Sequence, residues 1–90
     1  MKFEWDEQKA SKNLSNHKVL FEEAITIFND QLYIDFFDPD HSDNESRYIR
    51  IGLSNKSRLL IVSYTERNHV IRIISAREAT NREQEDYENG

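Results

Sequence analysis

An acidic segment in residues 38–44 divides this chain in two. Apolar residues of the region 6–29 recur at helical spacing, and from residue 32 onward they alternate or run together as they do in strands. The segment itself combines a proline with turn-forming residues, which predicts an exposed loop. A chain of 90 residues has room for one domain, so we expect residues 1–90 to form a single fold from these two halves.

Two helices are predicted in the first half, after a short strand at residues 2–5. Asp6 is a good N-cap for a helix that extends to Asn16. A second helix is predicted from Phe21 to Asn29, because its apolar residues follow the spacing i, i+3, i+4 and i+7. Neither helix is long enough to be stable alone, so both must pack against other elements.

Three or four antiparallel strands and a C-terminal helix are predicted in the second half. The run at 59–62 is continuously apolar, so this strand is expected at the centre of the sheet, covered on both faces. Ser75 and Glu78 have the spacing of a capping box, which predicts a helix from there to about Tyr87. The fold class is therefore α+β, with N-terminal helices packed on an antiparallel sheet of three to four strands. The strands are predicted at residues 32–37, 47–53, 59–62 and 70–74.

Charge is segregated along the chain, although the whole protein carries a net charge of −5. Residues 1–46 carry −7, residues 47–77 carry +6 and residues 78–90 carry −4. Six of the seven arginines lie in the positive segment. Because the planar guanidinium group binds phosphate well, this pattern favours a focused phosphate site over general polyanion binding. Arginines of an ordinary strand surface are the alternative.

The composition also excludes several classes of protein. The chain has no cysteine for disulfides, iron–sulfur clusters or thiol catalysis, and its two glycines leave no room for a phosphate loop. The three histidines do not have metal-ligand spacing, so we expect neither a metal nor another cofactor. Without a long apolar run or a signal region, we expect a cytoplasmic protein that does not bind membranes.

Candidate catalytic residues gather around the last two predicted strands. Tyr64 and Glu66 share a strand face at positions i and i+2, and the following turn brings Arg72 to the neighbouring strand. Arg77 is expected at the N-terminus of the last helix, where backbone N–H groups favour an anion. We expect one shallow phosphodiester pocket formed by Tyr64, Glu66, Arg67, Arg72 and Arg77.

Metal-free cleavage of RNA by the neighbouring 2′-hydroxyl suits this set. Glu66 or Tyr64 is the expected base, and the three arginines are expected to stabilise charge on the phosphate. A proton donor for the 5′-oxygen is expected among His17, Lys18 and His41. Further RNA-binding residues are expected to be Arg47, Arg50, Ser75 and Lys18.

Each of these residues also has a purely structural interpretation. Glu66 and Arg67 can end a strand in a solvated turn, and Arg72 can pair with an acid across the sheet. His17 can interact with the dipole of its helix. His69 is expected to be an exposed residue at the tip of a turn.

In these residues and in the segments given below, the sequence resembles the BrnT-type toxins of bacterial type II toxin–antitoxin systems. Its opening follows the pattern F-x-W-D-x-x-K-x-x-x-N-x-x-x-H from Phe3 to His17, with Lys18 where a glycine commonly follows the histidine. The resemblance extends over essentially the whole chain. Further matching segments are Phe21–Ala24 with Phe28, Asp38–Ser42 with Glu45 and Arg47, Ile51-Gly52, Leu60–Val62, Tyr64–Arg67, Ile71–Arg77, Ala79-Thr80, Glu83 and Tyr87.

The resemblance implies a RelE-like fold and an endoribonuclease that blocks translation. It also implies a BrnA-type antitoxin that neutralises the toxin in a complex with two copies of each protein. Operator DNA would be bound only through that antitoxin. The functional basic and polar residues of the family correspond to Arg67, Arg72 and Arg77, and further to Glu66, Ser75 and Tyr64.

Two other functions remain open at this stage. One is a RelE- or ParE-like toxin whose target is not RNA, because a fold does not determine a function. The other is a non-catalytic subunit that only forms a co-repressor complex. For the antitoxin contact we expect an acidic or amphipathic helix laid over the sheet.

Overall fold

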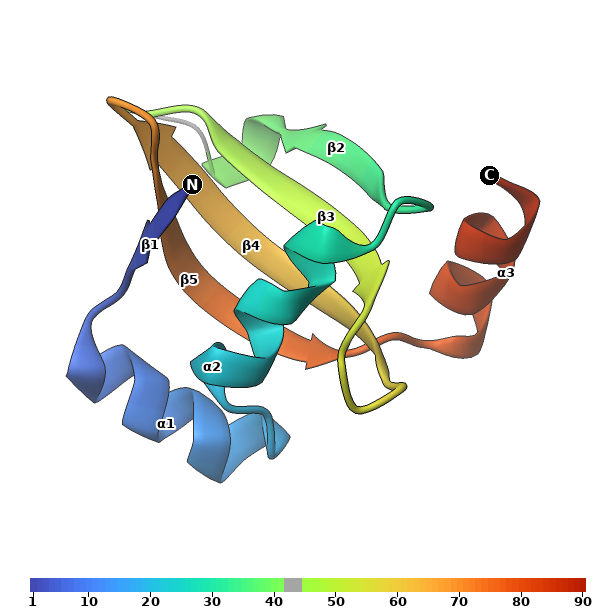
Figure 1. The fold of residues 1–90 in the computed structure, drawn as a ribbon, viewed down its shortest axis with the longest axis horizontal. Coiled ribbons are helices and arrows are strands. Elements are labelled where there is room, and N and C mark those ends of the chain that lie inside the picture. Colours follow the sequence, from blue (N-terminus) through green and yellow to red (C-terminus); the bar gives the residue numbers. More distant parts are fainter. Residues whose placement is uncertain (42–44) are drawn as a thin grey trace.

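A computed structural model describes residues 1–41 and 45–90, and the side chain of His41 lies outside the described part. In Figure 1, α1 and α2 lie together and α3 stands apart from them. No helix in the described ranges is both long and apolar enough to cross a membrane. The elements are β1 (Lys2–Glu4), α1 (Glu7–His17), α2 (Phe21–Ala24), the 3₁₀ helix η1 (Ile25–Asn29), β2 (Ile34–Asp38), the 3₁₀ helix η2 (Pro39–His41), β3 (Arg47–Leu53), β4 (Leu59–Arg67), β5 (Val70–Glu78) and α3 (Asn81–Asn89).

The sheet among these residues has five strands in the order β1-β5-β4-β3-β2, not three to four. It is also mixed, because β1 pairs parallel to β5 while the other neighbours are antiparallel. The prediction of a purely antiparallel sheet is therefore wrong. Its physical reason is the length of β1: three residues carry too little pattern to identify a partner that follows 68 residues later, as Glu4 pairs with Arg72. The prediction that β4 is central and buried is confirmed.

The first helix begins as predicted, because the Asp6 side chain accepts hydrogen bonds from the backbone N–H groups of Gln8 and Lys9 at 2.8 and 3.1 Å. It ends at Lys18, which adopts the left-handed conformation with φ = 60°. Glycine adopts this conformation without a steric penalty, so the glycine that the resemblance leads us to expect here would fit this helix end. Lysine keeps the same helix end at some conformational cost.

The helix predicted from Phe21 to Asn29 is α-helical only as far as Ala24 and continues as the 3₁₀ helix η1. The hydroxyl of Thr26 donates to the backbone oxygen of Glu23 at 2.7 Å and so competes for a carbonyl of the α-helical turn. The same hydroxyl accepts from the backbone N–H of Asn55 at 2.9 Å. This segment is therefore tightened where it meets the β3–β4 turn.

The C-terminal helix begins later than predicted. Strand β5 continues to Glu78, and the capping box is formed by Thr80 and Glu83 instead of Ser75 and Glu78. Ala76 is buried in the core and both of its backbone groups bond to the Asn13 side chain, which keeps this segment extended. The prediction that Arg77 lies at a helix N-terminus is therefore wrong.

The strand register divides the sheet into two faces. On the helix-covered face, as we call the side that packs under α1, α2 and η1, lie Tyr48, Arg50 and Tyr64. On the opposite side, which we call the open face, lie Arg47 and Arg72. Neighbouring residues of β3 therefore point to opposite faces, so Arg47 and Arg50 lie on different sides of the sheet. The core on the helix-covered face consists of Val19, Phe21, Ala24, Ile27, Leu60, Val62, Tyr64, Ile71, Ile73 and Ala76.

Candidate functional site

The open face brings together three of the predicted arginines, Arg47, Arg67 and Arg72. Arg72 lies opposite Thr65 on β4, and Thr65 lies opposite Arg47 on β3, so the three residues form one row across the sheet. Arg67 follows Thr65 by two positions and therefore points to the same face. Glu4 on β1 extends the row beyond Arg72. Three guanidinium groups from three strands thus share one surface.

Two glutamates complete this group. Arg72 Nη1 donates to Glu4 Oε2 at 2.8 Å, and Arg67 forms a two-pronged ion pair with Glu45. The hydrogen bond from Arg67 lowers the pKa of Glu45, and the charges of Arg67, Arg72 and Arg47 lower it further. Glu45 is therefore ionised at neutral pH. We call Glu4, Glu45, Arg47, Arg67 and Arg72 the arginine cluster, which has a net charge of +1.

Thr65 lies in the centre of the row that carries the arginine cluster. Its side chain is only 2% exposed, and its Oγ1 has no hydrogen-bond partner among the described residues. A buried hydroxyl usually finds a partner, because losing its hydrogen bonds to water without compensation is costly. The hydroxyl is therefore a free polar group in the floor of the arginine cluster.

Arg77 lies on the open face but away from the arginine cluster. It pairs across the sheet with Ile61 and forms a two-pronged ion pair with Glu83 of α3, with both distances 2.8 Å. The hydrogen bonds from Arg77 lower the pKa of Glu83 to about 2, despite its partial burial. Ser75 lies between Arg72 and Arg77 on β5, opposite Ser63.

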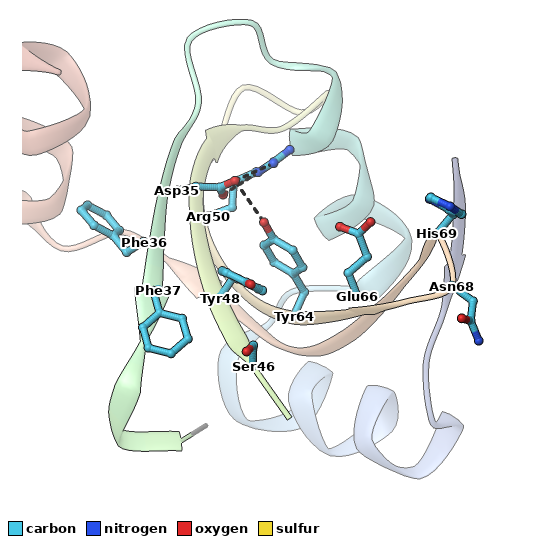
Figure 2. Close-up of a pocket in the computed structure, with 10 residues that line it drawn as sticks. All are labelled: Asp35, Phe36, Phe37, Ser46, Tyr48, Arg50, Tyr64, Glu66, Asn68 and His69. Carbon is cyan, nitrogen blue, oxygen red and sulfur yellow. Dashed lines mark hydrogen bonds and ion pairs between the residues drawn. The ribbon is translucent and has the colours of Figure 1, made fainter. Parts of the chain in front are cut away.

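Tyr64 and Glu66 point to the helix-covered face. They line a pocket of about 960 Å³ that Figure 2 shows at the β2 side of the sheet. The Tyr64 hydroxyl donates to Asp35 Oδ2 at 3.0 Å. The full lining consists of Asp35, Phe36, Phe37, Ser46, Tyr48, Arg50, Tyr64, Glu66, Asn68 and His69.

The structure also commits Arg50, an expected RNA-binding residue, to this pocket. Its guanidinium binds both carboxylate oxygens of Asp35 at 2.8 and 2.7 Å. It also lies over the rings of Tyr33 and Phe28, 3.9 and 4.4 Å from their centroids. With a side chain only 13% exposed, Arg50 is enclosed by these partners.

Burial, together with the nearby Asp35 carboxylate, raises the pKa of Tyr64 to about 12. Its phenol is therefore protonated at neutral pH and is a poor base. A hydrogen bond to Asp30 at 2.6 Å likewise raises the pKa of Tyr87 to about 12. Because protonation is favoured in the folded state, both phenols stabilise the fold below pH 10, and this stabilisation is lost as the pH rises through 12.

We therefore expect thermal stability to fall between about pH 10 and pH 12 as these two phenols ionise. The Tm, followed by circular dichroism at closely spaced pH values, measures this fall. Tyr87→Phe should flatten part of the slope, because it removes one of the two groups. A Tm that is level up to pH 12 would contradict the assigned hydrogen bonds.

His17 is the last residue of α1 and Lys18 is its C-cap. Neither residue belongs to the arginine cluster. The backbone oxygen of Lys18 accepts from Arg58 at 3.2 Å, and its Nζ donates to the backbone oxygen of Ser15 at 3.3 Å. His17 is in the last turn of α1, the position from which it can interact with the helix dipole. His69 adopts a left-handed conformation at the tip of the β4–β5 turn.

The structure thus does not gather the five predicted residues into one pocket. Antiparallel pairing places Thr65, not Tyr64, opposite Arg72, and so separates the two groups by the thickness of the sheet. Arg67 and Arg72 come together, and Arg77 is displaced along β5. Sequence reasoning missed Glu4, Glu45 and Thr65, although the alternation of β4 could have placed Thr65 beside Arg72.

Comparisons with known proteins agree with the fold. The sequence profile of a family described as "Ribonuclease toxin, BrnT, of type II toxin-antitoxin system" matches residues 5–83. The solved structure of the ribonuclease toxin BrnT of Brucella abortus is similar, with a TM-score of 0.66 and 23% sequence identity. The match covers 90% of this chain and 99% of that one, and it shows a shared fold. No curated protein matches the chain. With the profile covering most of its length, the chain belongs to the BrnT family of ribonuclease toxins of type II toxin–antitoxin systems.

Proposed function

We propose that this protein is an endoribonuclease that cleaves RNA without a metal ion, and that the arginine cluster of the open face binds the scissile phosphate. The observation that carries this proposal is the row formed by Arg47, Thr65 and Arg72, with Arg67 beside it. In this group, arginines from three strands act on a shared carboxylate, that of Glu45. A phosphodiester is the kind of anion that such a group binds.

The ion pairs of the cluster do not prevent this. The side chains of Arg67 and Arg72 are 66% and 36% exposed, and their glutamate partners are 31% and 50% exposed. Exposed ion pairs contribute little to stability, because water and salt screen them. A phosphate can therefore compete for the guanidinium groups, while the glutamates stay nearby.

In the proposed reaction the ribose 2′-hydroxyl attacks the phosphorus, and the 5′-oxygen leaves. Arg67 and Arg72 stabilise the negative charge that develops on the non-bridging oxygens. Glu4 or Glu45 accepts the 2′-hydroxyl proton, because these carboxylates lie within the arginine cluster. Glu66 lies on the other face of the sheet, out of reach of this phosphate, so we do not propose it as the base here. The leaving 5′-oxygen takes up a proton from water, and His41 is the residue we propose as an alternative donor.

The remaining predicted residues have supporting roles in this proposal. Arg47 adds positive charge beside the phosphate, and Ser75 and Arg77 extend the RNA-binding surface along β5. RNA cleavage then blocks translation, and a BrnA-like antitoxin neutralises the toxin in a complex with two copies of each. Operator DNA is bound only through that antitoxin.

Cleavage of a labelled synthetic RNA in the presence of EDTA tests the proposal. Arg72→Ala should lower the rate about 100- to 1,000-fold, the usual effect of removing one donor to a developing oxyanion. Arg67→Ala should also lower it. Arg82→Ala is the matched control, because Arg82 is exposed on α3. This variant should cleave RNA as fast as the wild type. The products should end in a 2′,3′-cyclic phosphate.

Two results would contradict this assignment. One is a wild-type protein that leaves RNA intact in EDTA but cleaves it when a divalent cation is added. The other is an Arg72→Ala variant that is as active as Arg82→Ala. Glu4→Gln, Glu45→Gln and Glu66→Gln then identify the base, because only loss of the proton acceptor should remove the dependence of the rate on its ionisation.

A further inference from the structure

Strand β2 forms one edge of the sheet and exposes large apolar side chains. Four of the eight exposed large hydrophobic residues among those described lie in residues 32–37. Phe36 and Phe37 are 45% and 54% exposed, and Leu32 is 72% exposed. Such a concentration on a small surface is typical of an interaction site, whereas single exposed apolar residues are ordinary.

The backbone of β2 is also unpaired on its outer side. It pairs with β3 on one side, and no other described strand lies next to it. Natural proteins usually protect such an edge with lysines, a bulge or a covering element. The C-terminal helix reaches only its beginning, where Gly90 packs against Ile34. The rest of the edge, through Phe37, remains available to a strand of another chain.

A pocket lies beside this edge. The ring of Phe37 contacts Tyr48 edge-on with centroids 5.9 Å apart, and Tyr48 stacks on Tyr64 at 5.7 Å. Figure 2 shows Phe37, Tyr48 and Tyr64 following one another around the pocket of about 960 Å³. A side chain from a strand added to β2 would find an aromatic wall there. Strand addition of this kind takes its affinity from the backbone and its specificity from such pockets.

Charge identifies the chemistry of the occupant. Residues 30–40, which contain β2 and the residues beside it, carry four acids and no lysine or arginine. A second copy of this chain would bring the same acids to the edge, and RNA would bring phosphates, so both are repelled. An extended protein segment with basic side chains is attracted. The edge, the pocket and the charge therefore agree on one class of partner.

We infer that the β2 edge binds an extended segment of the antitoxin in which basic and apolar residues alternate. This inference rests on the proposal that an antitoxin neutralises the protein, and it differs from the acidic or amphipathic helix expected from the sequence. The added strand pairs with β2, and one of its apolar side chains enters the pocket beside Tyr48. Its basic residues face the acids that surround the edge.

Binding of the proposed BrnA-like antitoxin, measured by isothermal titration calorimetry, tests the inference. The double variant Phe36→Ser/Phe37→Ser should bind at least about tenfold more weakly than the wild type. Leu14→Ser is the matched control, because Leu14 is 41% exposed on α1, and its affinity should be unchanged. Hydrogen exchange of the wild-type complex should show slower exchange in residues 34–38.

A second probe tests the chemistry directly. A short peptide that alternates lysine and valine should slow exchange in β2, and the same peptide with glutamate in place of lysine should not. The RNA-cleaving activity of each free variant is measured in parallel and should be unchanged, because the mutated rings are outside the arginine cluster. Loss of antitoxin binding is thus separated from loss of the proposed catalysis.

Each of five results would overturn the inference. The antitoxin could bind the double variant as tightly as it binds Leu14→Ser, or leave residues 34–38 unprotected. The free protein could be a dimer that only the double variant dissociates, which would make β2 an interface between two copies. Single-stranded RNA could slow hydrogen exchange in β2 where the lysine peptide does not. An antitoxin that fails to bind the wild type would contradict both this inference and the proposed antitoxin partner.

Discussion

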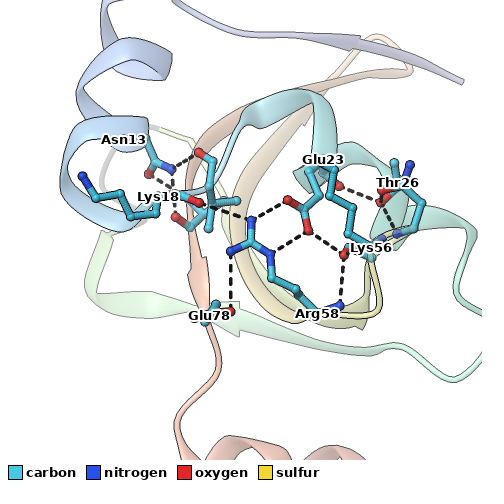
Figure 3. Close-up of polar contacts among 11 residues, drawn as sticks. Asn13, Lys18, Glu23, Thr26, Lys56, Arg58 and Glu78 are labelled. Atoms are coloured by element: carbon cyan, nitrogen blue, oxygen red, sulfur yellow. Dashed lines mark hydrogen bonds and ion pairs between the residues drawn. The ribbon is translucent and has the colours of Figure 1, made fainter.

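Replacing Arg58 with alanine should lower the free energy of unfolding by about 3–5 kcal/mol, because it leaves a buried carboxylate without its counter-charge. Glu23 is only 4% exposed. Arg58 binds both of its oxygens, at 2.5 and 3.0 Å, and the Ser54 hydroxyl donates to one of them at 2.7 Å. Figure 3 shows this carboxylate enclosed between α2 and the β3–β4 turn.

The Arg58 interactions also connect separate parts of the chain. The Nη2 of Arg58 also donates to the backbone oxygen of Lys18, so the same guanidinium group holds the end of α1. The hydrogen bond from Arg58 lowers the pKa of Glu23 despite burial, which means that the carboxylate stays charged when the arginine is present. A domain of this size is stabilised by only about 5–13 kcal/mol, so the expected loss is a large fraction of the whole.

Urea denaturation followed by circular dichroism measures the effect, with Arg82→Ala as the exposed-arginine control. The double variant Glu23→Leu/Arg58→Met should recover much of the loss, because it removes both charges and fills the space with apolar atoms. If Arg58→Ala unfolds within about 1 kcal/mol of the control, the pair is not the buried ion pair described above.

Asn13→Ala should destabilise the protein by about 2–4 kcal/mol, because one side chain satisfies three buried backbone groups. Its Nδ2 donates to the backbone oxygens of Val19 and Ala76 at 3.0 and 2.9 Å. Its Oδ1 accepts from the backbone N–H of Ala76 at 3.0 Å. The side chain therefore joins α1 to both the following loop and strand β5.

The control for this prediction is Asn16→Ala, an exposed asparagine on the same helix. Asn13→Asp should be nearly as damaging as Asn13→Ala, because it replaces a double donor with a group that only accepts. The free energy of unfolding is again obtained from urea titrations. Equal stability of the Asn13→Ala and Asn16→Ala variants would show that water replaces these three hydrogen bonds.

Much of the fold could be predicted because local pattern determines it. Asp6 begins a helix through its own side chain, and the apolar run of β4 is buried because that strand is central. Ser75 and Glu78 show where local pattern fails. Their spacing suits a helix cap, but Asn13, more than sixty residues earlier, keeps the segment extended by binding Ala76. No window around residue 75 contains that information.

The candidate site likewise has a part that the sequence predicts and a part that depends on long-range pairing. The sequence predicts arginines as the phosphate-binding groups, and Arg67 and Arg72 do share a face. Their glutamate partners could not be predicted. Glu4 comes close to Arg72 only through the parallel pairing of β1 with β5, and Glu45 precedes β3 outside any strand. Tyr64 and Arg72 were expected in one pocket but lie on opposite faces. The register of β4 and β5 decides which side chains share a face, and the residues near the turn do not fully determine that register.

The parallel pairing of β1 with β5 has a consequence for synthesis on the ribosome. Residues 2–4 are translated before β5, the strand with which they pair in the described part of the chain. Until residues 70–72 have been made, the growing chain lacks the Glu4–Arg72 contact and the strand that carries Arg72. A nascent chain therefore cannot form the arginine cluster before Arg72 has been added.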